Sequence, residues 1–275
     1  MAGPTGSPRD LAPAVTRSCQ ILDLLADAQG RPVPLTEIAA AIGAAKSSTF
    51  NLCVVLEENG LIQRRQSAGY TLGRRTVELG GAYIRSFDQL RDFHSSCLES
   101  PHLAHQLVKV AMLDGSDVLY LARHEGRAPF QFSASIGARF PAASTAVGNV
   151  LLSTMTDDEI SARFSSPGAL PRWTDDSVVD LPTLLHRVRR ARSRGWAVEE
   201  GAVLPGVHSY AVVLPPANHH EAPLALGVSF IATDTQDASR QALLGELITL
   251  RDQLVAPFAA MRPFLEDAPS GHAAS

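Results

Sequence analysis

The residue types best placed to do chemistry lie at 46–48, where a lysine and two serines open a stretch with helical apolar spacing. Lys46 can neutralise a phosphate. The hydroxyls of Ser47 and Ser48, together with the free backbone N–H groups of a helix start, can cap the helix or hold an anion. The chemistry that these residues offer is therefore the binding of phosphate groups.

Two short helices joined by a tight turn are predicted to position these residues. Gly43 lies where the turn requires a positive φ, and Ala39 is small where a second helix must cross the first closely. This arrangement is typical of a helix-turn-helix, whose second helix enters the DNA major groove. Apolar residues one turn apart give each helix a buried face: Ile38 and Ile42 on the first, Leu52 and Leu56 on the second.

A β-hairpin is predicted directly after these helices, which makes the unit a winged helix. Residues 61–65 and 70–72 form its strands, and residues 66–69 its turn. Four arginines lie beside or after the hairpin tip, where they can reach phosphates or the minor groove: Arg64, Arg65, Arg74 and Arg75. The alternative is an ordinary three-helix domain with a solvated hairpin.

The charge distribution fits DNA as a partner although the formal net charge is −4. The 275 residues, 45 % of them hydrophobic, are enough for one large domain or two small ones. Residues 13–91 carry nine Lys and Arg against seven Asp and Glu, whereas residues 92–275 carry fourteen against twenty. The basic excess is small, so specific DNA binding must rely on well-placed contacts more than on bulk attraction.

The cysteines and the chain ends indicate a cytoplasmic protein without disulfides. Cys19, Cys53 and Cys97 form no C-x-x-C pair, so neither a disulfide nor zinc is expected, and Cys19 and Cys53 are predicted to lie in the core. The first residues have no apolar signal region, and no apolar run approaches the length of a membrane span. Residues 1–12 and 267–275 are small, polar and rich in Pro or Gly, so we expect them to be disordered.

The rest of the chain predicts an α+β domain with one central, mostly antiparallel sheet. A first helix spans 15–28, and a linker helix begins at 76 and runs towards 93, with small residues that would let a second subunit's helix approach. Strands are predicted at 107–113, 118–122, 129–135, 196–199, 209–214 and 225–231. Helices are predicted at 145–155, 184–194 and 238–264, and a further helix is predicted to begin at 157.

Other chemically suggestive groups have plainer interpretations. Glu199 and Glu200 could be a catalytic pair, but neighbours on a strand point to opposite faces, so Glu199 is either a ligand contact or structural. His102 and His105 have helical spacing for two metal ligands, yet no third ligand is evident. The arginines at 187–194 could contact nucleic acid, or they end a helix, where cations suit the dipole. No P-loop, G-x-S-x-G or H-E-x-x-H motif is present, and no enzyme, cofactor or metal is expected.

From about residue 14 to about 254 the chain resembles the isocitrate lyase regulator (IclR) family of bacterial transcription factors. No single motif is specific, but their order and spacing are. In the first part they are Val15-Thr16-Arg17-Ser18-x-x-Ile21-Leu22, Leu35-Thr36-Glu37-Ile38-Ala39, Lys46-Ser47-Ser48, Leu56-Glu57-x-x-Gly60-Leu61-Ile62 and Gly69-Tyr70-x-Leu72-Gly73. In the second they are Leu113-Asp114-Gly115, Gly137-x-x-x-Pro141, Ala146-x-Gly148, Arg194-Gly195-Trp196 and Pro205-Gly206-Val207.

The resemblance implies a domain organisation and a function. It implies a winged helix-turn-helix DNA-binding domain at 13–74, a linker and dimerisation helix at 75–95, and a GAF-like effector-binding domain at 96–266. It also implies a repressor or activator, here expected to be a repressor of a metabolic operon. Such a regulator binds a near-palindromic operator as a dimer or tetramer and responds to a small organic effector, either a carboxylate or an aromatic metabolite.

The resemblance also implies the residues of two sites. Contacts with double-stranded DNA are expected from Arg17, Thr36, Lys46, Ser47, Ser48, Phe50, Asn51, Arg64 and Arg65. The effector is expected to contact Phe132, Ala146, Val147, Glu199, Ser209, Gly227 and Ser229.

Three positions depart from the family pattern. Asn51 stands where the recognition helix commonly has Arg, and Asn reads adenine whereas Arg prefers guanine or phosphate. Ser209 replaces a common Cys and Gly227 a common Ser, so we expect a roomier pocket that suits a ligand larger or less polar than a two-carbon acid. Two other functions stay open: an enzyme or metabolite carrier that uses the pocket, and an architectural DNA-binding protein.

Overall fold

The computed structural model describes residues 11–66, 68–126, 135–216, 221–233 and 235–259, without the side chains of 256–259. The chain forms two compact units, Met1–Ser86 and Phe87–Ser275. Within the described ranges no single helix is long and apolar enough to cross a membrane; Leu35–Ala41 and Lys46–Glu58 meet that test only as a pair bent by 108°.

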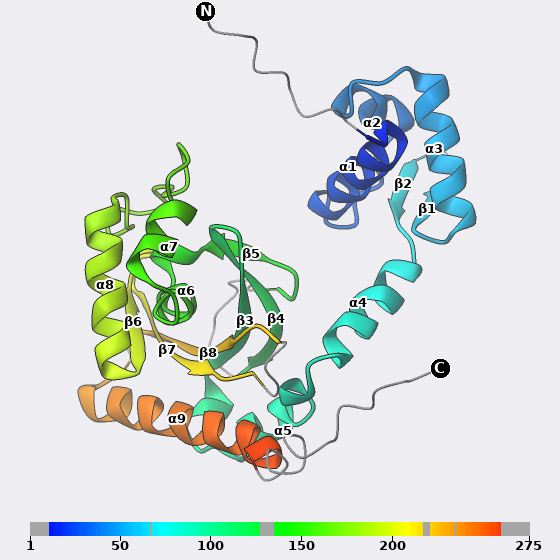
Figure 1. Ribbon diagram of the computed structural model, residues 1–275. Helices are drawn as coiled ribbons and strands as arrows, with labels where there is room; N and C mark the ends of the chain where they lie inside the picture. The colour runs from blue at the N-terminus through cyan, green and yellow to red at the C-terminus, as the bar shows by residue number, and fades with distance from the viewer. Residues whose placement is uncertain (1–10, 67, 127–134, 217–220, 234, 260–275) are drawn as a thin grey trace, which may run out of the picture. The chain divides into compact units, whose positions relative to one another are not determined.

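The first unit is a three-helix domain followed by a two-stranded hairpin (Figure 1). Its elements are α1 (Pro13–Asp27), α2 (Leu35–Ala41), α3 (Lys46–Glu58), β1 (Ile62–Arg65) and β2 (Gly69–Leu72). Apolar side chains from all five elements and from the α1–α2 connection meet in one core. They are Ile21, Leu25, Val33, Ile38, Cys53, Leu56, Ile62 and Tyr70.

The helix-turn-helix has the predicted local geometry. Gly43 has a φ of +60° in the turn between α2 and α3, and Ala39 is buried where the helices cross. The prediction that Cys19 is a core residue is wrong, because its side chain is exposed. The buried stripe of α1 is Ile21 and Leu25, and Cys19 lies two residues before it, about 200° around the helix.

The linker helix is shorter than predicted. Helix α4 spans Arg75–Arg85 instead of running on to 93–95, and Phe87 is already extended. A 3₁₀ turn at Asp88–Leu90 and helix α5 (Phe93–Glu99) follow. Phe93 and Cys97 are buried, and both belong to the second unit.

The second unit is built on a six-stranded sheet in which every described pair of neighbours is antiparallel. The strand order is β5-β4-β3-β8-β7-β6. The strands are β3 (Leu107–Asp114), β4 (Asp117–Glu125), β5 (Arg139–Pro141), β6 (Trp196–Glu200), β7 (Val207–Leu214) and β8 (Leu224–Ile231), with 3₁₀ turns at Leu103–His105 and Ala142–Ser144.

Helices cover both faces of this sheet, which explains why β8 is buried from Leu224 to Phe230. Helix α6 (Ala146–Leu152) lies on one face, and α9 (Asp237–Ala259) lies on the other (Figure 1). Small side chains at Ala111, Ala211 and Ala225 let α6 approach the sheet closely. The predicted apolar stripe of α9 is confirmed by the buried leucines Leu243, Leu247, Leu250 and Leu254.

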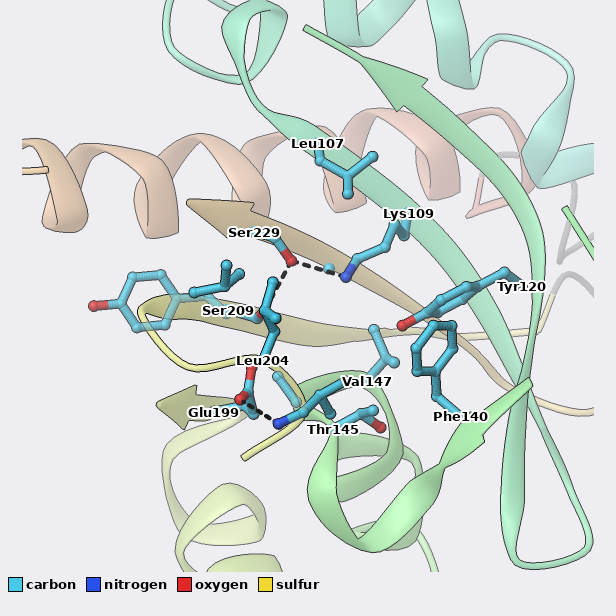
Figure 2. Close-up of a pocket in the computed structure, with 15 residues that line it drawn as sticks. Leu107, Lys109, Tyr120, Phe140, Thr145, Val147, Glu199, Leu204, Ser209 and Ser229 are labelled. Carbon is cyan, nitrogen blue, oxygen red and sulfur yellow. Dashed lines mark hydrogen bonds between the residues drawn. The ribbon is translucent and has the colours of Figure 1, made fainter. Parts of the chain in front are cut away.

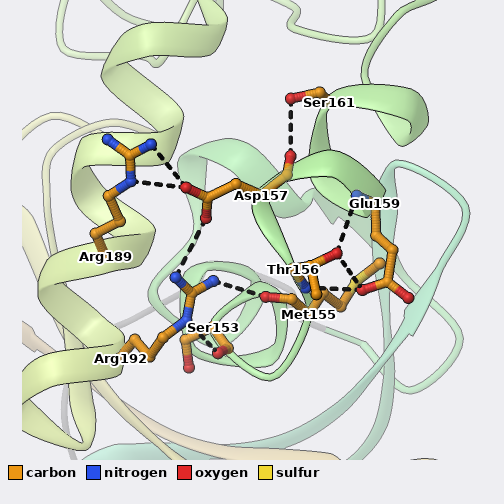
Figure 3. Close-up of polar contacts among 8 residues, drawn as sticks. All are labelled: Ser153, Met155, Thr156, Asp157, Glu159, Ser161, Arg189 and Arg192. Carbon is orange, nitrogen blue, oxygen red and sulfur yellow. Dashed lines mark hydrogen bonds and ion pairs between the residues drawn. The ribbon is translucent and has the colours of Figure 1, made fainter.

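Helices α7 (Asp157–Arg163) and α8 (Leu181–Arg194) are joined by a polar cluster (Figure 3). The Asp157 carboxylate accepts hydrogen bonds from Arg189 Nε at 2.8 Å and from Arg192 Nη1 at 3.2 Å. Thr156 and Glu159 form a capping box at the start of α7. Part of the predicted arginine run therefore holds two helices together.

Several predictions lie outside the described residues. They are Phe132, the strand at 129–135 apart from its last residue, the disorder of nearly all of 1–12 and of 267–275, and the end of the helix at 238–264.

Candidate DNA-binding surface and effector cavity

The residues predicted to contact DNA are accessible on the first unit. Arg17 is half-buried, and the other eight are exposed: Thr36, Lys46, Ser47, Ser48, Phe50, Asn51, Arg64 and Arg65. Helix α3 begins at Lys46, and the Ala45 N-cap provides no side-chain hydrogen bond to its first turn. Backbone N–H groups at such a helix start are available to a phosphate.

The hairpin is fixed to the helices by backbone hydrogen bonds. The N–H of Val33 donates to the carbonyl of Tyr70 at 2.8 Å, and the N–H of Tyr70 donates to the carbonyl of Val33 at 2.9 Å. Arg65 lies opposite Gly69 in the hairpin register. This pairing sets the position of both Arg64 and Arg65 relative to α3.

An apolar cavity of about 60 Å³ lies in the second unit between α6 and the concave face of the sheet (Figure 2). That volume is room for roughly four to six water molecules. Six of the seven residues predicted to contact an effector line it: Ala146, Val147, Glu199, Ser209, Gly227 and Ser229. The seventh, Phe132, lies outside the described residues.

Lys109 also lines the cavity, and the sequence analysis did not predict it. Its buried Nζ donates to Ser229 Oγ at 2.8 Å, and Ser229 Oγ lies 2.8 Å from Ser209 Oγ (Figure 2). The ammonium lies 5.3 Å from the centre of the Tyr120 ring. Burial lowers the pKa of Lys109 to about 8, and Glu199 opposes this by favouring the charged form. The signal was a lysine inside the apolar run at 107–113.

Glu199 contributes a second buried charge, as its place on the strand predicts. Its side chain is 4 % exposed, whereas Glu200 is exposed. Oε1 of Glu199 accepts hydrogen bonds from the backbone N–H groups of Ala202 and Val203. Burial raises the pKa of this carboxyl, although the hydrogen bonds and Lys109 lower it. The adjacent pair is thus not arranged for joint acid–base catalysis.

The space expected beside Gly227 is already filled, which corrects the prediction of a roomier pocket. A Cβ on Gly227 would lie 2.6 Å from Cγ1 of Val147 and 3.3 Å from the carbonyl oxygen of Tyr210. Glycine is needed here because α6 packs its valine onto the strand. A ligand much larger than the present cavity therefore requires side chains to move.

An amide at the start of helix α6 is capped within the helix itself. Thr145 is its N-cap, and the Thr145 hydroxyl oxygen accepts the N–H of Gly148 at 3.0 Å. Apolar side chains form most of the remaining wall, including Leu107, Leu204, Val207 and the mutually tilted rings of Tyr120 and Phe140, whose centres lie 5.2 Å apart. The single cation of the cavity, among the described residues, is therefore its main feature for attracting an anion.

The predicted alternatives to binding have less support. His102 forms an ion pair with Glu246, on α9, and the described residues include no group of three His, Cys, Asp or Glu that could hold a metal. His105 ends a 3₁₀ turn instead of continuing a helix with His102.

Comparisons with known proteins match both units. Residues 14–66 match the IclR helix-turn-helix domain, and residues 90–255 match the C-terminal domain of IclR-type bacterial transcriptional regulators. The chain belongs to the IclR family. It is a transcriptional regulator of the type that binds DNA through a helix-turn-helix and small effectors through a C-terminal domain.

Individual relatives agree with this assignment. The chain is 28 % identical over 243 residues to the HTH-type transcriptional regulator XynR of Escherichia coli, covering 88 % of this chain and 92 % of XynR. It is 27 % identical to the transcriptional repressor AllR of Salmonella typhi, covering 73 % of each chain.

Solved IclR structures share the fold. An IclR regulator from Alicyclobacillus acidocaldarius superposes with a TM-score of 0.75 at 22 % identity, covering 89 % of this chain and 98 % of that one. An IclR homologue from Microbacterium hydrocarbonoxydans, crystallised with 4-hydroxybenzoate, superposes with a TM-score of 0.73 at 17 % identity, covering 88 % and 99 %.

Proposed function

We propose that this IclR-family regulator represses a metabolic operon by binding a near-palindromic operator as a dimer or tetramer. We further propose that a small monocarboxylate enters the cavity beside Lys109 and changes its affinity for DNA. Repression is supported by relatives that carry the name of repressor. The effector class is supported by one observation, the buried ammonium in an otherwise mostly apolar cavity.

Pairing of two subunits is supported by the surface of α4. None of the residues of this helix is buried within the described chain, yet it carries several large apolar side chains. Val77 is 76 % exposed, Leu79 51 % and Tyr83 46 %. Leu79 and Tyr83 lie one turn apart on one face of the helix, whereas Val77 lies about 200° around the helix from Leu79. A second copy of the helix would cover the face of Leu79 and Tyr83, and a two-fold axis there would place two winged helices on two half-sites.

The DNA surface is tested by salt titration of Lys46→Ala and Arg65→Ala on operator DNA. Each variant should bind more weakly, and its slope of log affinity against log salt should flatten by about 0.9 for each phosphate that the protein no longer neutralises. Arg172→Ala, in the second unit, should leave the slope unchanged. Unchanged slopes in both variants would contradict the proposed surface. Sedimentation of the parent chain with operator DNA should give at least two chains per operator.

The effector class is supported by the electrostatics of the cavity. A buried ammonium that donates to one serine keeps two further N–H groups for a ligand, and an anion there would compensate its charge. Glu199 would repel a second carboxylate, so the ligand should carry one acid group on an apolar body. The related regulator crystallised with 4-hydroxybenzoate holds a ligand of that class.

The effector proposal predicts a pH dependence with a definite sign. Anion binding needs the ammonium form of Lys109, whose pKa is about 8, so affinity should fall above pH 8 by up to about tenfold per pH unit. Calorimetry with a panel of aliphatic and aromatic monocarboxylates between pH 6.5 and 9.5 checks this. A panel in which no acid changes operator affinity would instead favour an architectural role for the second unit.

A second candidate function is hydrolysis, because Ser229 and Lys109 have the separation of a serine–lysine pair. For that role Lys109 must be neutral to accept the serine proton, whereas Glu199 favours the ammonium. The two functions have opposite pH dependence, since hydrolysis would rise as Lys109 loses its proton. Turnover of p-nitrophenyl acetate that increases above pH 8 and vanishes in Lys109→Met would favour the enzyme.

A further inference from the structure

A second hollow of about 370 Å³ lies along α8 and the edge strand β6, and it shares no lining residue of the effector cavity. Three arginines of α8 line it: Arg187, Arg190 and Arg194. Their spacing of three and then four residues places them on one face of the helix. The arginines of the 187–194 run that line the hollow are therefore those that do not join α8 to α7.

The two faces of α8 use their arginines differently. Arg189 and Arg192 form ion pairs with Asp157, as Figure 3 shows. Within the described chain, none of the arginines of the hollow forms an ion pair with a carboxylate. Arg187 donates to the backbone carbonyl of Asp176 at 3.3 Å, and the guanidinium of Arg194 lies 4.9 Å from the centre of the Trp196 ring.

A buried acceptor without a donor lies in the wall of the same hollow. Asn149 is 2 % exposed, and its Nδ2 donates to the carbonyls of Ala143 at 2.9 Å and Thr145 at 2.7 Å, which fixes the orientation of the amide. Its Oδ1 has no hydrogen-bond partner among the described residues. Buried acceptors are almost always paired with a protein group or an ordered water, so this oxygen has the capacity to accept one further donor.

We propose that this hollow is a second ligand site, which binds a hydroxylated organic anion such as a sugar acid or a sugar phosphate. The acid group would lie against Arg190 and Arg194, because guanidinium groups match carboxylate and phosphate geometry. Asp176 and Glu200 also line the hollow and disfavour a bare polyanion, but their oxygens, like Asn149 Oδ1, accept hydrogen bonds from hydroxyls. Selectivity should therefore require both an acid and hydroxyl groups.

The test is calorimetric titration of the full chain with five matched probes. Gluconate and glucose 6-phosphate carry an acid and hydroxyls, glucose carries hydroxyls only, and acetate and inorganic phosphate carry an acid only. We expect at least one of the first two to bind, and at least tenfold more tightly than the other three. The tighter of the two tells whether a carboxylate or a phosphate is preferred.

Variants assign the binding to the hollow. Arg190→Gln and Arg194→Gln should each weaken it by about tenfold or more, since each removes a charge-assisted contact. Arg189→Gln is the matched control, because it removes the same charge from the other face of α8 and should leave binding unchanged.

Three results would overturn the proposal. One is that gluconate and glucose 6-phosphate bind no more tightly than glucose, acetate or phosphate. Another is that both hollow variants bind as tightly as the parent chain. The third is that binding disappears in Lys109→Met, because the ligand would then occupy the effector cavity. A failure of the effector proposal leaves this test unaffected, since its readout is binding at α8.

Discussion

Gly69→Ala should destabilise the winged helix by about 2–4 kcal/mol and abolish operator binding. The glycine has a φ of +124°, and an added Cβ would lie 2.3 Å from the carbonyl oxygen of Val33. That carbonyl accepts the N–H of Tyr70, so the clash breaks the pairing that holds the hairpin against the helices. Arg64 and Arg65 then lose their fixed position relative to α3. Denaturant unfolding measures the destabilisation, and titration with operator DNA measures the binding.

Gly43→Ala is the matched control for this substitution. Gly43 also has a positive φ, +60°, but a Cβ there would meet no atom within 4 Å. Only the backbone conformation is penalised, which costs about 1 kcal/mol. Equal destabilisation by the two substitutions would show that the contact with Val33 does not matter and that the hairpin is held in another way.

The helix-turn-helix could be predicted from the sequence because its determinants are local. Ile38, Gly43 and Leu56 specify a buried face, a turn and a second buried face within about twenty residues, and the hairpin follows directly. Five strands of the second unit, β3, β4, β6, β7 and β8, were likewise predictable from apolar alternation, whereas the short strand β5 was not predicted. Six cavity residues were predictable only through the family resemblance, because they come from distant segments that no local pattern links.

The features that escaped prediction depend on contacts between distant segments. Lys109 faces the cavity because β3 pairs with β8, which places it opposite Gly227. The packing of α6 onto the sheet brings Val147 against that glycine and fills the expected space. No pattern within one segment encodes any of these contacts.

Lys109→Met should abolish the response to monocarboxylates while making the unliganded chain more stable. Keeping this ammonium buried is costly at pH 7, because the folded pKa of about 8 lies below the ordinary value of 10.5. That difference corresponds to about 3–4 kcal/mol, which the apolar methionine would recover. The parent chain binds fewer protons folded than unfolded between pH 8 and 10.5, so its stability rises there and the advantage of the variant should shrink.

The pKa itself can be measured directly, because the chain contains only two lysines, Lys46 and Lys109. NMR of lysines labelled with ¹³C at Cε should show one resonance that titrates near pH 8 and is absent from Lys109→Met. A bound monocarboxylate should move the midpoint of this titration to higher pH, since an anion favours the ammonium. Lys46→Met is the matched control: Lys46 is exposed, so the same substitution should weaken DNA binding without stabilising the fold. If Lys109→Met is less stable than the parent at pH 7 and still responds to the acid, Lys109 supports the fold and another group binds the effector.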